Sequence, residues 1–133
     1  MAVIAQLSLG VSNAGRAGAF WAAALGYRRR PPRFDNDEWI VLEPPAGALG
    51  AAIAMDLSES PAEEFPRLHL DLDTAERPLD EELDRLLTLG ARIIEWRHYP
   101  TDPHPAEPPY VVLADPEGNR FCLSGRRNPG AAT

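Results

Sequence analysis

Residues 3–11 and residues 67–73 both alternate between apolar and polar side chains. That period of two is typical of a strand with one buried face. Each segment is followed by an apolar stripe at helical spacing, over residues 14–25 in the first half and from Pro78 in the second. A glycine follows each stripe and ends the helix in a left-handed conformation. Both halves therefore begin as strand then helix.

Turn residues divide the rest of each half into short strands, because proline and glycine interrupt regular structure. Ser12 or Asn13 is a candidate N-cap for the first helix, and Thr74 for the second, with Pro78 at its first position. The further strands are predicted at residues 27–34, 38–43, 49–57, 91–98, 110–114 and 120–124.

The two halves also align residue by residue, which indicates an internal repeat. The segment QLSL from Gln6 matches HLDL from His69, and LG at the end of the first helix matches LG at the end of the second. Duplicated units of this kind pack about a pseudo-twofold axis. We therefore expect a single α+β domain over 1–125, made of two tandem βαβββ modules (1–57 and 67–125) joined by a linker at 58–66, with a tail at 126–133.

Composition excludes several classes of protein. The chain has 133 residues, of which 44% are hydrophobic, and it carries a net charge of −7. That size suits one domain, and the acidic balance disfavours both nucleic acids and anionic membranes as partners. Cys122 is the single cysteine, so no intramolecular disulfide forms. With neither a signal-peptide pattern nor a spanning segment at the N-terminus, we expect a cytoplasmic location.

Side-chain parity predicts which face of the sheet carries the chemistry. The leucines of each first strand must meet the helix of the same half, so the other face of the strand carries polar groups. The aromatic residues Trp39, Trp96 and Tyr110 belong either to the core or to the wall of a cleft on that face. If the sheet curves, that face becomes a cleft suited to a small molecule. The residues predicted to line it are Gln6, Ser8, Trp39, His69, Asp71, Trp96, Tyr110, Arg120, Cys122 and Ser124.

Four segments carry a family resemblance: AQLSLGVSN, FWAAALGY, LHLDL and VVLADPEGNRFCL. They resemble the vicinal oxygen chelate superfamily, which includes glyoxalase I, bleomycin-resistance proteins, fosfomycin-modifying enzymes and extradiol dioxygenases, and look most like its small glyoxalase-like subgroup. The resemblance spans residues 5–124. It implies the glyoxalase/bleomycin-resistance/dioxygenase fold, in which a U-shaped, curved mixed sheet surrounds a cleft, and it implies a homodimer as a common assembly.

The resemblance also implies metal ligands on the first and last strands of each module, usually His or Gln and Glu. Those positions fall on Gln6, His69 and Cys122. The counterpart in the first module falls within residues 51–55, where no side chain is a good ligand for a hard metal. Cys122 stands where a glutamate is expected, and this set suits zinc or copper better than magnesium or manganese. The cofactor is therefore one divalent metal (zinc, nickel, iron or manganese) or none.

Each of these residues has an alternative role. His69 is either a ligand or catalytic base, or a histidine hydrogen-bonded to Asp71 or Gln6. Gln6 is a weak ligand or a donor to a bound molecule, and Cys122 is a thiolate or a packed thiol. The proline-rich loop at 99–109 is a lid or a plain solvated loop.

Two functions remain open. In the first, the cleft binds a small molecule for sequestration or sensing, as in bleomycin resistance, with a planar or cationic antibiotic as one class of ligand. In the second, the chain is a divalent-metal-dependent lyase, isomerase or dioxygenase of the glyoxalase type that uses His69. Whether it is an enzyme is left open by the sequence.

Overall fold

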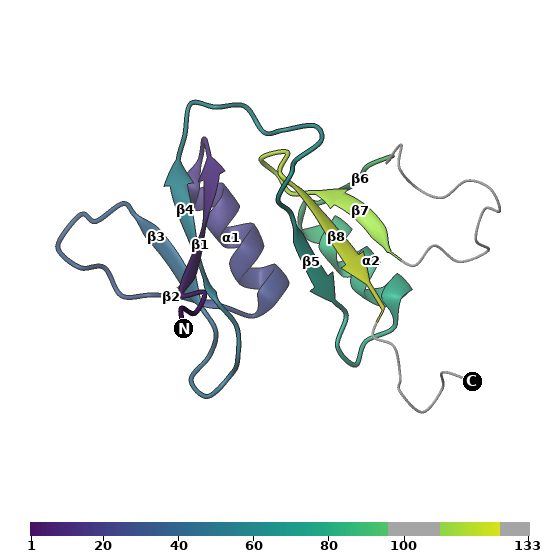
Figure 1. Ribbon diagram of the computed structural model, residues 1–133, viewed down its shortest axis with the longest axis horizontal. Helices are drawn as coiled ribbons and strands as arrows, with labels where there is room; N and C mark the ends of the chain where they lie inside the picture. Colours follow the sequence, from purple (N-terminus) through teal and green to yellow (C-terminus); the bar gives the residue numbers. More distant parts are fainter. Residues whose placement is uncertain (96–109, 126–133) are drawn as a thin grey trace. The chain divides into compact units, whose positions relative to one another are not determined.

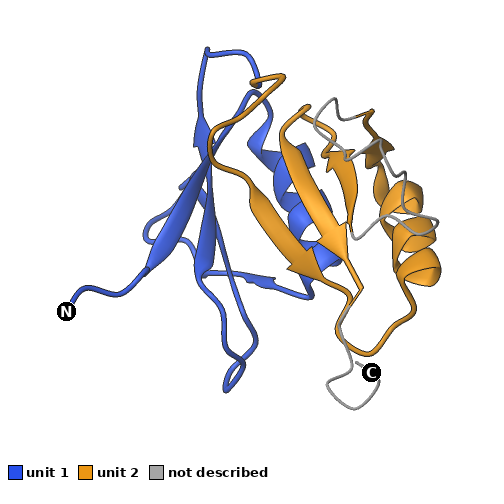
Figure 2. Cartoon of the chain, turned by 45° about the vertical axis from the view of Figure 1, so that its right-hand side comes forward, with its two compact units in different colours: residues 1–62 blue, residues 63–133 orange. Residues whose placement is uncertain are grey.

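The structure is a computed structural model that describes residues 1–95 and 110–125. The chain divides into two compact units, residues 1–62 and residues 63–133 (Figure 2). Their boundary falls inside the predicted linker at 58–66. Within the described residues, each unit contains one helix and a four-stranded mixed sheet (Figure 1), which confirms the α+β class and the two βαβββ modules.

Unit 1 has the element order β1 (Gln6–Val11), α1 (Ala14–Leu25), β2 (Arg28–Arg29), β3 (Ile40–Glu43) and β4 (Ala52–Leu57). Its strands lie in the order β1-β4-β3-β2, with β1 parallel to β4 and the other neighbours antiparallel. Unit 2 repeats this arrangement with β5 (Leu70–Asp73), α2 (Leu79–Leu89), β6 (Arg92–Ile93), β7 (Val111–Ala114) and β8 (Arg120–Ser124), in the order β5-β8-β7-β6.

Helix α1 forms where the sequence predicts it. The Asn13 side chain accepts a hydrogen bond from the Arg16 backbone N–H at 3.0 Å, and Gly26 ends the helix with φ of 66°. Phe20 and Trp21 are buried and meet edge to face, with ring centroids 5.2 Å apart. At Gly18 the helix approaches β3 so closely that an added Cβ would lie 3.2 Å from the Ile40 side chain. The apolar stripe of α1 therefore packs on the sheet of its own unit.

Helix α2 begins one residue later than predicted. Pro78 is its N-cap rather than its first helical residue, and no side chain caps it, so Thr74 does not serve as the cap. Asp80, Glu81 and Glu82 occupy the first turn, where negative charge interacts favourably with the helix dipole. The start of this helix is therefore stabilised by negative charge in its first turn rather than by a capping side chain.

Several strands are shorter than predicted. The strand expected at 27–34 is reduced to β2, because Pro31 and Pro32 have no backbone N–H to continue the ladder. The first strands begin three residues late in each unit, at Gln6 and at Leu70, and Leu68 is 78% exposed. Strand β4 begins at Ala52 rather than at residue 49, and β6 covers two residues of the predicted 91–98, of which 96–98 lie outside the described residues.

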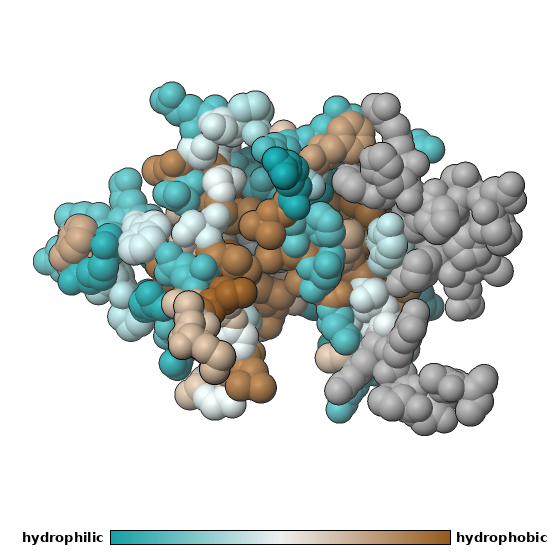
Figure 3. Space-filling model, viewed as in Figure 1, coloured by the Kyte–Doolittle hydropathy of each residue, from teal (hydrophilic) through white to brown (hydrophobic). Residues whose placement is uncertain are grey.

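The core of each unit lies between its helix and its sheet. Leu42, Ile53 and Met55 are buried in unit 1, and Leu86, Leu113, Phe121 and Leu123 in unit 2. Large hydrophobic side chains are also exposed in each unit, and hydrophobic and hydrophilic residues share the face drawn in Figure 3. No helix among the described residues is long and apolar enough to cross a membrane.

Candidate functional site

A pocket of about 620 Å³ lies on unit 2. Its polar side chains come from strands β5 and β8 and from His69, which directly precedes β5. Val112 of β7 and Tyr110, which directly precedes β7, form an apolar and aromatic wall. Six of the residues predicted from side-chain parity take part, together with four that were not predicted. The lining residues are His69, Asp71, Asp73, Tyr110, Val112, Arg120, Phe121, Cys122, Ser124 and Gly125.

Strand register brings these side chains together. In the parallel β5–β8 pair, Asp71 is opposite Cys122 and Asp73 is opposite Ser124. In the antiparallel β7–β8 pair, Val112 is opposite Cys122. Because alternate residues of a strand share one face, all five side chains lie on the same face of the sheet, and Phe121 and Leu123 are buried on the other.

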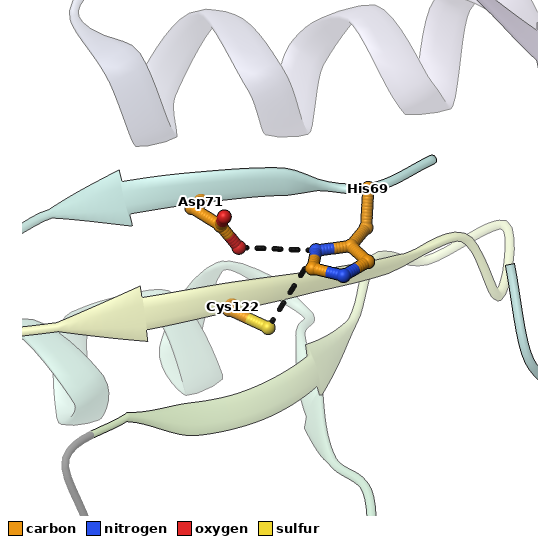
Figure 4. Close-up of side chains that lie close together, drawn as sticks. All are labelled: His69, Asp71 and Cys122. Carbon is orange, nitrogen blue, oxygen red and sulfur yellow. Dashed lines mark hydrogen bonds and ion pairs between the residues drawn. The ribbon is translucent and has the colours of Figure 1, made fainter. Parts of the chain in front are cut away.

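Three side chains converge at the middle of this face (Figure 4). The Asp71 Oδ1 lies 3.0 Å from the His69 Nδ1, and the Cys122 Sγ lies 3.8 Å from the same nitrogen. The hydrogen bond between His69 and Asp71 is one of the alternatives raised by the sequence. One donor atom from each of the three residues falls within 4.8 Å of the other two. The His69 side chain is 34% exposed, so solutes reach the cluster.

The electrostatics of the cluster keep Cys122 protonated. Burial raises the pKa of the Cys122 thiol to about 11, and the Asp71 carboxylate adds to the shift by its negative charge and by accepting a hydrogen bond from the thiol. At neutral pH the side chain is therefore a neutral thiol, which is neither a base nor an effective nucleophile. A cation placed among the three groups would reverse this preference, because it stabilises the thiolate.

The pair formed by His69 and Asp71 has chemistry of its own. When the imidazole is neutral and its Nδ1–H donates to Asp71, Nε2 carries the lone pair and is the atom that accepts a proton. The carboxylate then fixes the tautomer and the orientation of the ring. The arrangement suits a general base or a metal ligand.

Two of the three donor separations can be compared with those of a zinc site. Donor atoms of a tetrahedral zinc site lie about 3.3–3.6 Å apart, given bond lengths of about 2.0–2.3 Å. The separations from the His69 Nδ1, 3.0 Å to the Asp71 Oδ1 and 3.8 Å to the Cys122 Sγ, bracket that range. An ion bound there would take Nδ1 as its imidazole ligand, with the ring hydrogen on Nε2. Imidazole, carboxylate and thiolate are all zinc ligands, and the thiolate disfavours magnesium or manganese. His69, Asp71 and Cys122 therefore fit a zinc-type ion with small side-chain rotations.

Arg120 lies next to this cluster on β8. Its Nε donates to the Glu64 carbonyl oxygen at 3.5 Å, and Nη1 is buried with no hydrogen-bond partner within residues 1–95 and 110–125. At the other end of the face, the Ser124 hydroxyl donates to the Leu72 carbonyl oxygen at 3.4 Å. The pocket thus carries a positive charge near one end and the carboxylates of Asp71 and Asp73 further along.

The remaining predicted residues belong to unit 1. Gln6 and Ser8 share one face of β1, and the Gln6 Nε2 donates to the Ser8 Oγ at 3.3 Å. In the β1–β4 pair, Ser8 is opposite Ala54, as Asp71 is opposite Cys122 in unit 2. Ala54 is therefore the counterpart of Cys122, and it is fully buried beside Val41 and Ala52. The methyl group of Ala54 carries no donor atom for a metal.

Trp39 is 38% exposed and stacks with Arg33, whose guanidinium lies 4.7 Å from the ring centroid. Arg33 in turn forms an ion pair with the buried Asp37 at 2.8 Å. Trp39 is therefore part of a local cluster in unit 1. Trp96 and the loop at 99–109 lie outside the described residues.

Sequence reasoning missed four of the residues that line the pocket and one role within it. Asp73 and Val112 have the parity of Asp71 and Tyr110, so the same alternation could have added them to the lining. Asp71 was predicted to contact a ligand, with no place among the metal donors. The signal for its place beside Cys122 is the cross-strand register, which no local pattern of residues contains.

Comparison with known families agrees with this architecture. The model of the glyoxalase-like domain family matches residues 6–124. The chain therefore belongs to the glyoxalase-like domain family. A search of curated proteins finds no match.

Solved structures of low sequence identity share the fold. A glyoxalase/bleomycin resistance protein/dioxygenase superfamily member from Sphaerobacter thermophilus has 20% identity and a TM-score of 0.62, over 95% of this chain and 98% of the other. A family enzyme from Burkholderia phytofirmans has 20% identity and a TM-score of 0.60, over 93% and 98%. The fosfomycin resistance protein FosX from Mesorhizobium loti has 13% identity and a TM-score of 0.65, over 93% and 91%. These likenesses show the fold alone.

Proposed function

We propose that this chain binds a small molecule in the pocket of unit 2 and acts by sequestration or sensing. The observation that carries the proposal is the pocket itself. Its volume of about 620 Å³ lies within the range of about 300–1,000 Å³ common for ligand sites. Tyr110 and Val112 offer an apolar wall, while Asp71, Asp73 and Arg120 provide charged groups that orient a ligand.

The chemistry of Cys122 supports binding over catalysis. Glyoxalase-type isomerisation needs a carboxylate base at the metal, and the resemblance implies a glutamate at this position. Cys122 is instead a neutral thiol, since its pKa is raised to about 11. In unit 1 the corresponding side chain is the methyl group of Ala54. Neither of these two positions therefore supplies the carboxylate.

A ligand screen with a matched pair of variants tests the binding function. Ser124 lines the pocket and Ser60 is exposed in the linker, so Ser124→Trp fills the pocket and Ser60→Trp adds the same ring elsewhere. Planar, cationic and anionic compounds are screened by thermal shift and confirmed by calorimetry. A pocket ligand binds the wild type and Ser60→Trp, and loses affinity for Ser124→Trp. Equal affinity for all three proteins, or no ligand across the panel, contradicts the proposal.

A second candidate function is a metal-dependent lyase, isomerase or dioxygenase of the glyoxalase type. The convergence of His69, Asp71 and Cys122 favours it, because three donor atoms lie within 4.8 Å of one another. A divalent ion held by these residues would supply Lewis acidity toward an oxygen of the substrate. His69 and Asp71 would orient that substrate and move a proton, and the apolar wall of the pocket would exclude water.

Turnover assays distinguish this candidate from simple binding. Protein loaded with zinc, nickel, manganese or iron(II) is assayed with glutathione adducts, epoxides and catechols. Metal-dependent turnover that His69→Ala abolishes and Asp35→Ala leaves intact would support the enzyme, since Asp35 is exposed in a turn of unit 1. Absence of turnover with every metal leaves binding as the function.

A further inference from the structure

The short distance between the Asp71 carboxylate and the His69 imidazole makes Asp71 a candidate metal ligand in unit 2. Its Oδ1 is 3.0 Å from the His69 Nδ1, and the register of β5 and β8 places it opposite Cys122. The carboxylate is anchored on a strand and is 71% exposed, so it is free to change partners. A cation that enters the cluster meets this carboxylate together with the imidazole and the sulfur.

Unit 1 has no comparable group to offer. The residue paired with Ser8 is Ala54, and the Gln6 amide donates its own hydrogen bond to Ser8. An amide oxygen is a neutral and weak donor, whereas a carboxylate contributes both charge and a strong oxygen ligand. The strongest donor set on the described residues is therefore contained within unit 2.

We infer that Asp71 is a metal ligand, and that unit 2 alone holds a zinc-type ion through His69, Asp71 and Cys122. This set differs from the one that the family resemblance implies, because Asp71 takes the place of Gln6. A tetrahedral ion held by three protein donors would have one position left for a small-molecule ligand. The inference rests on the proposed function only in using the same pocket.

The donor chemistry sets the selectivity of the site. A thiolate and an imidazole prefer zinc and cobalt(II) to manganese or magnesium. Cobalt(II) is a useful probe, because a bond to sulfur gives a charge-transfer band in the near ultraviolet and a tetrahedral site gives intense visible bands. Full-length protein should therefore acquire both features with cobalt(II) and lose them when zinc is added. Manganese(II) should leave its free-ion electron paramagnetic resonance signal unchanged.

Four variants separate the ligands from their neighbours. Cys122→Ser should abolish the charge-transfer band, which assigns the sulfur. Asp71→Asn keeps the size of the side chain and should weaken cobalt(II) binding by more than the roughly 10–100-fold that loss of a ligand's hydrogen-bond partner costs. It should also change the visible bands of the bound cobalt(II), because an oxygen ligand is lost. Asp73→Asn is the matched control, because Asp73 is the next residue of β5 on the same face of the sheet as Asp71. It should bind cobalt(II) as the wild type does. Gln6→Ala should also bind as the wild type does.

Two results would overturn the inference. If Asp71→Asn binds cobalt(II) like Asp73→Asn, the carboxylate is not a ligand, and a simultaneous loss in Gln6→Ala would assign the amide instead. If the wild type shows no sulfur band with cobalt(II) and no stabilisation by zinc, the site does not exist. Circular dichroism verifies that each variant is folded. If the protein binds no metal, the proposed binding function is still tested by the ligand screen with Ser124→Trp, because that screen uses organic ligands without added metal.

Discussion

Replacing Asp115 with alanine tests how firmly the turn between β7 and β8 holds the strand that carries Cys122. Asp115 is fully buried, and its Oδ1 accepts hydrogen bonds from the backbone N–H groups of Glu117 and Asn119, at 2.8 Å and 2.9 Å. The backbone adds a bond from the Asp115 N–H to the Asn119 carbonyl oxygen at 2.9 Å. One carboxylate oxygen therefore organises a turn that aligns two strands of the pocket.

The size of the effect follows from these two bonds. A hydrogen bond to a charged group contributes about 1.5–3 kcal/mol, so two contribute roughly 3–6 kcal/mol. Water that enters the opened turn recovers part of this, and we expect Asp115→Ala to lower the free energy of unfolding by about 3 kcal/mol. For a chain of this length that corresponds to a fall in Tm of roughly 10–15 °C. Asp115→Asn keeps an oxygen acceptor and should lose about 1 kcal/mol.

Urea denaturation monitored by tryptophan fluorescence, together with a thermal melt, measures both variants. Asp35→Ala is the control, because Asp35 is an exposed acid in a turn of unit 1. If Asp115→Ala is as stable as Asp35→Ala, the reasoning that this carboxylate organises the turn is wrong. If Asp115→Ala does not fold, the milder Asp115→Asn still measures how much the carboxylate contributes to the free energy of unfolding.

Three further predictions concern charge and helix ends. The hydrogen bonds from Arg33 hold the pKa of Asp37 well below its ordinary value of 3.8, so the pair stabilises the fold above that pH, and the contribution is lost as the pH falls. Urea midpoints measured from pH 7 to pH 2 should therefore fall less steeply for Asp37→Asn than for the wild type. The pKa of Cys122 is raised from 9.0 to about 11, so its contribution is complete below pH 9 and declines as the pH rises to 11. Alkylation of the native thiol by iodoacetamide should be slow at pH 8 and accelerate toward pH 11, and an equally fast reaction at pH 8 in native and unfolded protein would contradict this. Gly26 has φ of 66° with open space around its Cβ position, so Gly26→Ala should cost about 1 kcal/mol of stability, measured by thermal melting, through backbone strain alone.

Much of the fold is local in origin and could be predicted. The alternation at 3–11 and 67–73, the apolar stripe of α1 and the Asn13 cap each depend on residues close together in the chain. The repeat between the halves then predicted the same order of helix and strands in both. The ends of the strands were less predictable, since β1 and β5 begin only where a neighbouring strand offers hydrogen-bond partners.

The sequence by itself determined which side chains share a face, because parity along a strand is a local property. It thereby placed His69, Asp71, Cys122 and Ser124 on one side of the second sheet. Only the tertiary structure decided which of them touch, because register joins residues that are about fifty positions apart in the chain. The meeting of Asp71 with Cys122, and the raised pKa of the thiol that follows from burial and from that meeting, are consequences of strand pairing rather than of any motif.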